Sequence, residues 1–166
     1  FGVGGSNEES MGIIHGHQRP LTTLRSALEG DRMHHAWIFS GPEGVGKCTM
    51  AEELARILLD PTLDGSHLGE PEPVLNTEVG TLLVAGTHPD LHVIRKEDAA
   101  WSDNRQLRER KQLNIPLDLL RERMIGGRTS DGKIKEAPAY RTPSMGNGKV
   151  FIIDESELLD RTAQNV

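Results

Sequence analysis

A glycine-rich stretch between an apolar run and a helical pattern constrains this chain more than any other part of it. The stretch is Ser40-Gly41-Pro42-Glu43-Gly44-Val45-Gly46-Lys47-Cys48-Thr49, and it follows the apolar run Ala36-Trp37-Ile38-Phe39. A short run that is apolar throughout predicts a strand buried on both faces in a parallel sheet. Met50, Leu54 and Leu58 recur at helical spacing, which predicts a helix from about residue 46 to 59. A strand, a glycine-rich turn and a helix in this order predict a loop that binds phosphate groups.

The residue types of this loop explain why it suits phosphate. Glycines let the backbone wrap closely round an anion, and the N–H groups at the start of the next helix point at it. Lys47 places a positive charge on the outer phosphates. The predicted nucleotide-binding residues are Gly41, Gly44, Val45, Gly46, Lys47, Cys48 and Thr49.

Cys48 departs from this pattern, because such loops carry a serine or threonine hydroxyl that binds Mg²⁺ at this position. Mg²⁺ prefers oxygen, and a thiol is a poor substitute. Thr49 does not simply take over, because one helical step rotates its side chain by roughly 100°. We expect nucleotide binding to survive this change and metal-assisted hydrolysis to become less efficient. Beside Lys47 at a helix N-terminus, Cys48 is either a reactive thiolate or a small inert thiol.

A second apolar run ends in two acids. The segment Lys149-Val150-Phe151-Ile152-Ile153-Asp154-Glu155 predicts a buried strand with both acids at its carboxyl end. Ligands of open α/β sheets bind at that edge. We expect Asp154 to reach a bound Mg²⁺, and Glu155 to be the catalytic residue that orients water if the chain hydrolyses ATP.

The remaining pattern predicts an α/β fold with a mainly parallel sheet, because strands alternate with helices. We expect a helix with Pro20 in its first turn and a stop at Gly30, a strand over 91–94, a helix over 115–125 and a helix beginning near Ser156. Residues 82–85 fit a helix or a strand. Residues 61–80 predict an irregular loop, and 126–147 a polar loop that we expect to be mobile.

Composition excludes several classes of protein. The chain has 166 residues, a net charge of -6 and one cysteine, which excludes a disulfide framework and a multi-cysteine zinc site. No apolar run approaches the ~20 residues of a membrane span, and the first ten residues do not resemble a signal peptide, so we expect a cytoplasmic protein.

Residues 95–128 carry 9 basic and 6 acidic side chains. They form either a solvated face or a strip that contacts phosphates. The seven histidines form no ligand set and are expected at surface or capping positions.

Four segments in order resemble the ATPase modules of the bacterial DNA polymerase III clamp loader, most closely those of its delta-prime subunits. They are Gly16-His17-Gln18-Arg19-Pro20-Leu21, His35 to Lys47, Ala85-Gly86-Thr87-His88-Pro89-Asp90, and Gly148 to Glu155 running on to Leu158-Leu159 and Thr162-Ala163-Gln164-Asn165. The resemblance spans most of residues 14–166.

This resemblance implies a three-layer AAA+ fold that binds ATP, and a subunit that works with other clamp-loader subunits, the sliding clamp and primed DNA. Delta-prime subunits often lack the metal-binding hydroxyl and act mainly as structural members. Arg161 lies in a region that faces DNA in such assemblies. We expect a flexible lead-in over 1–10 and one nucleotide-binding domain over 11–166, with the arginine finger, lid and collar beyond residue 166. The family's four-cysteine zinc module is not expected, because residues 61–87 contain no cysteine.

Two alternatives stay open at this point. The chain could be a P-loop ATPase motor of the same or a related AAA+ assembly, with Lys47 on phosphate, Asp154 on Mg²⁺ and Glu155 on water. A nucleotide-binding scaffold outside replication explains fewer of the matched segments.

Overall fold

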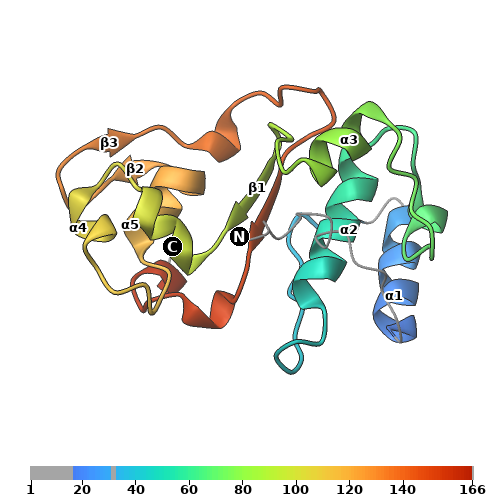
Figure 1. The fold of residues 1–166 in the computed structure, drawn as a ribbon, viewed down its shortest axis with the longest axis horizontal. Coiled ribbons are helices and arrows are strands. Elements are labelled where there is room, and N and C mark those ends of the chain that lie inside the picture. Colours follow the sequence, from blue (N-terminus) through green and yellow to red (C-terminus); the bar gives the residue numbers. More distant parts are fainter. Residues whose placement is uncertain (1–16, 31–32, 166) are drawn as a thin grey trace, which may run out of the picture. The chain divides into compact units, whose positions relative to one another are not determined.

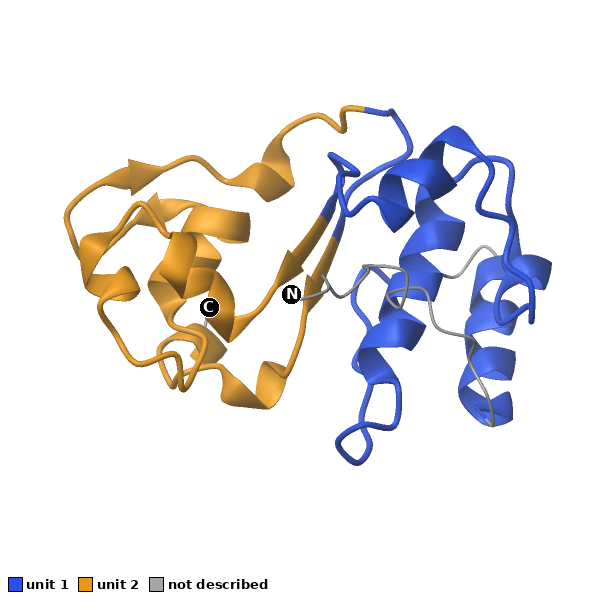
Figure 2. Cartoon of the chain, in the orientation of Figure 1, with its two compact units in different colours: residues 1–91, 145–150 blue, residues 92–144, 151–166 orange. Residues whose placement is uncertain are grey.

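The computed structural model describes residues 17–30 and 33–165 (Figure 1). The chain divides into two compact units, coloured separately in Figure 2: unit 1 holds residues 1–91 and 145–150, and unit 2 holds residues 92–144 and 151–166. The predicted lead-in over 1–10 lies outside the described residues, and the single domain over 11–166 stays a prediction. No described helix is both long and apolar enough to cross a membrane.

Unit 1 is built on helices whose apolar stripes face one another. Leu21 and Leu24 of one helix pack with Met50, Leu54 and Ile57 of another in a single buried cluster. The helices of this unit are α1 (Gln18–Glu29), α2 (Lys47–Leu59) and α3 (Glu78–Val84), with the 3₁₀ helix η2 (Gly65–His67) between the last two. The predictions of α1, of its end at Gly30 and of α2 are confirmed, and α3 decides the open choice over 82–85 in favour of a helix.

Residues 61–80 are tied to α2 by buried charged groups. Arg56 is fully buried, and its guanidinium donates to both carboxylate oxygens of Glu53, at 2.9 and 2.7 Å, and to the carbonyl of His67 at 3.1 Å. Asp60 accepts hydrogen bonds from the hydroxyls of Thr62 and Thr77, both at 2.6 Å. Burial alone would raise the pKa of Asp60, but these hydrogen bonds, with Arg56 nearby, hold that pKa below its usual value.

Two strands that are far apart in the sequence form a small parallel sheet. β1 (Leu91–Ile94) and β4 (Val150–Ile153) are neighbours, as Figure 1 shows, and both strands were predicted at these residues. Val150 N–H donates to Asp90 O, and Asp154 N–H donates to Ile94 O, so residue numbers rise together along both strands. The described sheet is smaller than the central sheet that the sequence predicted.

Unit 2 packs short elements around a core that includes Ile94, Leu107, Ile115, Leu119 and Leu120. Its elements are η3 (Lys96–Trp101), α4 (Arg105–Arg108), α5 (Leu117–Leu120), the π-helical turn η4 (Arg121–Ile125), β2 (Gly127–Arg128), β3 (Ile134–Lys135), η5 (Pro138–Tyr140), η6 (Ser156–Leu158) and η7 (Ala163–Asn165). The helix predicted over 115–125 is present as α5 followed directly by η4.

The loop predicted over 126–147 contains a hairpin. β2 and β3 pair antiparallel, with Gly127 opposite Lys135 and Arg128 opposite Ile134. The turn between them is closed by a hydrogen bond of 2.6 Å from the Thr129 hydroxyl to Asp131. Asp131-Gly132 is a common hairpin signal, although the prediction for residues 126–147 was a polar loop without strands.

The strand predicted over Ala36–Phe39 is wrong, because no described strand pairs with this segment. Trp37 and Phe39 pack against the core of unit 1, whereas Ile38 between them is 89% exposed. Alternating burial is typical of an extended chain that covers a core with one face only. The apolar run therefore lies extended on unit 1 and is not enclosed on both sides.

The regular helix predicted from Ser156 is also wrong. The chain forms two separate 3₁₀ helices, because Leu159 between them pairs with Ile115 in a parallel bridge. Asp160 then accepts from the Thr162 hydroxyl at 2.6 Å and from Ala163 N–H at 2.8 Å. Burial would raise the pKa of Asp160, and these hydrogen bonds hold it below its usual value.

Candidate phosphate-binding site

The glycine-rich loop of unit 1 leads directly into the N-terminus of α2. Gly44 and Gly46 have φ angles of 75° and 91°, in the left-handed region that favours glycine. Gly46 is the N-cap of α2, and none of the described side chains caps this helix end. The first N–H groups of a helix have no partner within the helix, so the start of α2 can donate to an anion.

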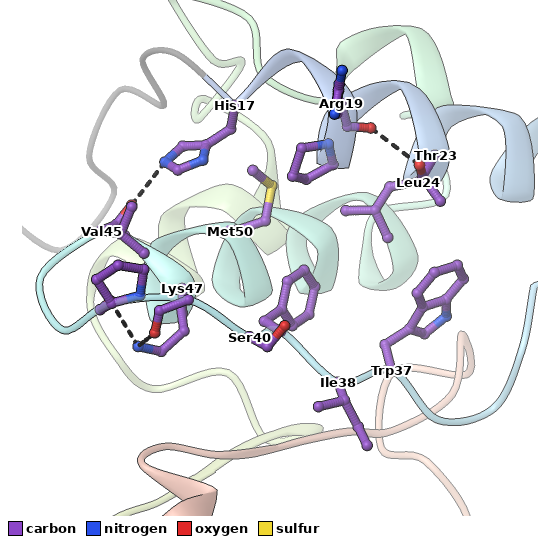
Figure 3. A pocket seen from close by; sticks show the side chains of 15 residues that line it. His17, Arg19, Thr23, Leu24, Trp37, Ile38, Ser40, Val45, Lys47 and Met50 are labelled. Atoms are coloured by element: carbon purple, nitrogen blue, oxygen red, sulfur yellow. Dashed lines mark hydrogen bonds between the residues drawn. The ribbon is translucent and has the colours of Figure 1, made fainter.

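Lys47 folds back over this loop. Its Nζ donates to the carbonyl oxygens of Gly41 and Pro42, at 2.9 and 3.0 Å (Figure 3). An ammonium group has three donors, and a phosphate oxygen is a stronger acceptor for it than a neutral carbonyl. The Lys47 ammonium group therefore lies beside the loop, where it can donate to a bound phosphate in place of a backbone carbonyl.

His17 contacts the same loop from the start of α1. Its Nε2 lies 2.7 Å from the carbonyl oxygen of Val45, and because a carbonyl only accepts, Nε2 is the protonated nitrogen (Figure 3). The sequence predicted surface or capping positions for the histidines and no contact of this kind. Only the resemblance, through Gly16-His17-Gln18, pointed to this residue. His17 thus connects α1 to the loop that precedes α2.

A cavity of about 430 Å³ lies beside the loop. Phe39 contributes an apolar side chain to its wall. Figure 3 shows Leu24, Trp37 and Met50 on the same wall, and the loop with Lys47 contributes the polar side. A concave apolar wall with a few polar groups at one end is typical of a small-molecule site.

Cys48 is half-buried on the first turn of α2. Its Sγ lies 3.7 Å from Oε1 of Glu52, one turn further along the helix, in the geometry of a thiol donating to a carboxylate. A thiolate in this position would be repelled by the carboxylate. The geometry therefore favours the inert thiol over the reactive one.

The two predicted acids lie in unit 2, directly after β4. Arg95 Nε donates to Asp154 Oδ2 at 3.1 Å, and Lys96 Nζ donates to Glu155 Oε2 at 2.8 Å. Among the described residues, Glu155 is the one non-glycine residue with a positive φ, at 54°. Such a backbone conformation costs about 1–3 kcal/mol and is found more often at functional positions than elsewhere.

The structure places the predicted site residues in both units. The seven predicted nucleotide-binding residues are together in unit 1, and Asp154, Glu155 and Arg161 belong to unit 2. Arg161 is exposed in the turn between η6 and η7, and its carbonyl accepts from the side chain of Asn165 at 2.7 Å. Within 17–30 and 33–165, no three His, Cys, Asp or Glu side chains gather as a metal site.

Comparison with known proteins gives consistent matches. The sequence model of the family described as "DNA polymerase III, delta subunit" matches residues 16–166. The chain is 30% identical over 145 residues to DNA polymerase III subunit delta' of Pseudomonas aeruginosa, which covers 86% of this chain and 35% of the relative. It is 32% identical over 79 residues to subunit delta' of Bacillus subtilis, covering 48% of this chain and 22% of the relative. DNA polymerase III subunit tau of Escherichia coli is 29% identical over 158 residues, which covers 95% of this chain and 19% of the relative. The chain thus spans about a third or less of the length of these relatives.

Proposed function

Because this chain belongs to the DNA polymerase III delta subunit family, we propose that it is part of a clamp-loader subunit of the bacterial replicative polymerase. In this role it supports the ATP-driven loading of the sliding clamp onto primed DNA, together with other clamp-loader subunits. The similarity to both delta' and tau sequences supports this assignment. The fold that we propose for the whole module is AAA+, which the family implies.

The observation that carries a nucleotide-binding role is the open start of α2 beside Lys47. Gly44 to Thr49 provide backbone N–H groups, Gly44 and Gly46 adopt the left-handed conformations that such a loop requires, and Lys47 lies within reach of its carbonyls. These residues fit the phosphates of ATP, and we propose that they hold them. The cavity lined by Trp37, Phe39 and Met50 provides adjoining apolar surface.

We propose further that the subunit acts mainly as a structural member of the assembly. Cys48 offers Mg²⁺ a thiol in place of a hydroxyl, and its Sγ is engaged with Glu52. No other described side chain in the first turn of α2 replaces that hydroxyl on the same face of the helix. ATP bound here would therefore be hydrolysed slowly, and the subunit would contribute contacts to its neighbours.

The alternative is a competent ATPase motor. The strained backbone of Glu155 at the end of β4 favours it, because a catalytic carboxylate is one reason for a residue to keep such a conformation. Asp154 and Glu155 would then act on Mg²⁺ and on the attacking water, as the sequence predicts.

Titration of a fluorescent ATP analogue distinguishes the two functions. The wild-type chain and Cys48→Thr are each titrated with and without Mg²⁺. For a structural subunit, we expect the wild-type affinity for the analogue to be the same with and without Mg²⁺. In Cys48→Thr we expect Mg²⁺ to increase that affinity. Tight Mg²⁺-dependent binding by the wild type, with no gain in the variant, would support the motor.

The clamp-loader assignment has its own test. The full subunit that carries this chain is mixed with gamma or tau subunits and with the sliding clamp, and clamp loading on primed DNA is measured. Loss of loading when this subunit is omitted supports the assignment. Unchanged loading without it contradicts the assignment, whatever the nucleotide titration gives.

A further inference from the structure

The acids after β4 are paired with cations that follow β1. Asp154 N–H donates to Ile94 O at 3.0 Å, so the two strands are in register where they end. The residues directly after the two strands then pair in the same register. Arg95 pairs with Asp154, and Lys96 pairs with Glu155. Both pairs have the same sequence separation of 59 residues, because both follow from one parallel register.

The four side chains cancel in charge. A carboxylate attracts a divalent cation through its negative potential, and a guanidinium or ammonium about 3 Å away opposes that potential. Glu97 adds a third acid at 3.8 Å from Lys96, so the ammonium lies between two carboxylates. The cluster already holds the positive charge that a metal ion would bring.

These two pairs contribute little to the stability of the fold. The side chains of Arg95 and Asp154 are 45% and 29% exposed, and those of Lys96 and Glu155 are 25% and 41% exposed. Ion pairs that water reaches contribute little to folding. The pairs lie at the end of β4, where the sequence predicts a metal ligand. The two cations there reduce the attraction of the acids for a divalent metal ion.

The present arrangement does not fit Mg²⁺. Mg²⁺ requires several oxygen ligands in nearly octahedral geometry. One oxygen of Asp154 and one of Glu155 already accept from the cations, and the described part of the chain holds no group of three ligand-type side chains.

We propose that Arg95 and Lys96 are built-in counterions that take the place of a divalent cation at Asp154 and Glu155. The acidic end of β4 is then a charge-balanced cross-link between the ends of two strands and not a metal site. This inference does not depend on nucleotide binding in unit 1 or on Cys48, so it can fail while the proposed function stands.

Mn²⁺, which has an electron paramagnetic resonance signal in its free form, tests the proposal on the full chain without nucleotide. We expect no saturable Mn²⁺ binding by the wild type at concentrations up to the order of 1 mM, and a gain in affinity of at least about tenfold in R95M/K96M. Methionine keeps most of the side-chain length and removes the charge. R105M/K133M is the matched control, because Arg105 and Lys133 also pair with carboxylates in unit 2, those of Glu109 and Asp131.

Adding D154N/E155Q to R95M/K96M should abolish the gain, which places the new Mn²⁺ site at these acids. Saturable binding by the wild type that D154N removes would overturn the proposal, as would the absence of any gain in R95M/K96M with an unchanged circular dichroism spectrum. The wild-type measurement decides the first point even if the double variant fails to fold.

Discussion

Glu53 with Arg56 in unit 1 and Asp154 with Arg95 in unit 2 are both carboxylate–guanidinium pairs, but water reaches only the second. The side chains of Arg56 and Glu53 are 0% and 10% exposed, against 45% and 29% for Arg95 and Asp154. Arg56 also donates to the carbonyl of His67, so it satisfies backbone as well as Glu53. We therefore expect the buried pair to contribute to the stability of the fold and the exposed pair to contribute little.

The buried pair also explains how residues 61–80 are held. Residues 61–87 contain no cysteine, so they have no ligands for the cysteine-rich zinc module that the resemblance to clamp-loader modules implies. In this chain Glu53 accepts from Gly69 N–H at 3.3 Å, and Asp60 accepts from Thr77 at 2.6 Å. Polar side chains at and near the end of α2 therefore tie this loop to the helix.

Removal of Arg56 gives the largest expected effect. Arg56→Met leaves the Glu53 carboxylate buried without its partner, and we expect the free energy of unfolding to fall by about 3–5 kcal/mol. Urea unfolding followed by circular dichroism measures it. The double variant E53Q/R56M, which removes both charges, should lose less than Arg56→Met alone. A loss below about 1 kcal/mol in Arg56→Met would contradict the contrast between the two pairs.

Lys47 lies on the same helix as Arg56, but we propose that it binds phosphate and does not hold the core, so its removal should spare the fold. We expect Lys47→Ala to weaken binding of a fluorescent ATP analogue by roughly 10- to 100-fold, because a charge-assisted hydrogen bond contributes about 1.5–3 kcal/mol. The free energy of unfolding should change by less than about 0.5 kcal/mol.

Lys111→Ala, a change at an exposed lysine of unit 2, is the control and should leave nucleotide affinity unchanged. Equal loss of affinity in both variants would mean that overall charge, and not the loop, governs binding. Unchanged affinity in Lys47→Ala would remove Lys47 from the proposed site.

The sequence predicted the elements whose signals are local. The start of α2 at the glycine-rich loop, the end of α1 at Gly30 and both strands of the parallel sheet follow from apolar spacing and breakers. The environment of Ile38 did not follow, because burial on both faces depends on what packs against the segment. The helix from Ser156 failed for a related reason, since the bridge between Ile115 and Leu159 joins residues far apart in sequence.

In the candidate site, too, local signals were predicted and contacts between distant residues were not. Composition and spacing identified Lys47, Cys48 and the acids after β4, whereas the partners of those groups come from distant residues. His17 reaches Val45 across 28 positions, and Arg95 reaches Asp154 across 59. A charged residue after one strand gives no signal of which strand lies beside it.

A smaller effect is expected at Asp60, whose carboxylate is buried like that of Glu53 but is held by hydroxyl groups. Its pKa in the folded chain lies below the usual 3.8, so Asp60 stabilises the fold above that pH and the contribution is lost as the pH falls through the folded pKa. Thr77→Val removes a hydrogen bond to Asp60 and the cap of α3 at Gly80, and we expect a loss of about 1–3 kcal/mol at pH 7.

The difference between Thr77→Val and the wild type should narrow as the pH is lowered below 3.8, because the protonated Asp60 no longer gains from the wild-type hydrogen bond. Thr81→Val is the control on the same helix, because the Thr81 hydroxyl donates to the carbonyl oxygen of Thr77, at 2.9 Å, and not to a carboxylate. Urea unfolding at several pH values measures both. A difference that stays constant with pH in Thr77→Val would show that the lost helix cap, and not Asp60, accounts for the effect.

Arg95→Met is expected to change the free energy of unfolding least among these variants that remove a partner of a carboxylate. Because water reaches Arg95 and Asp154, Arg95→Met should change the free energy of unfolding by less than about 1 kcal/mol. Raising the salt concentration from about 0.1 to 1 M shortens the screening length from about 10 to 3 Å, so the small loss should shrink further. The loss in Arg56→Met should respond little to salt, since a buried pair is screened much less. A loss of several kcal/mol in Arg95→Met that salt does not reduce would place this pair with the buried one, and the acids after β4 would then belong to the fold and not to a site whose charge can be changed.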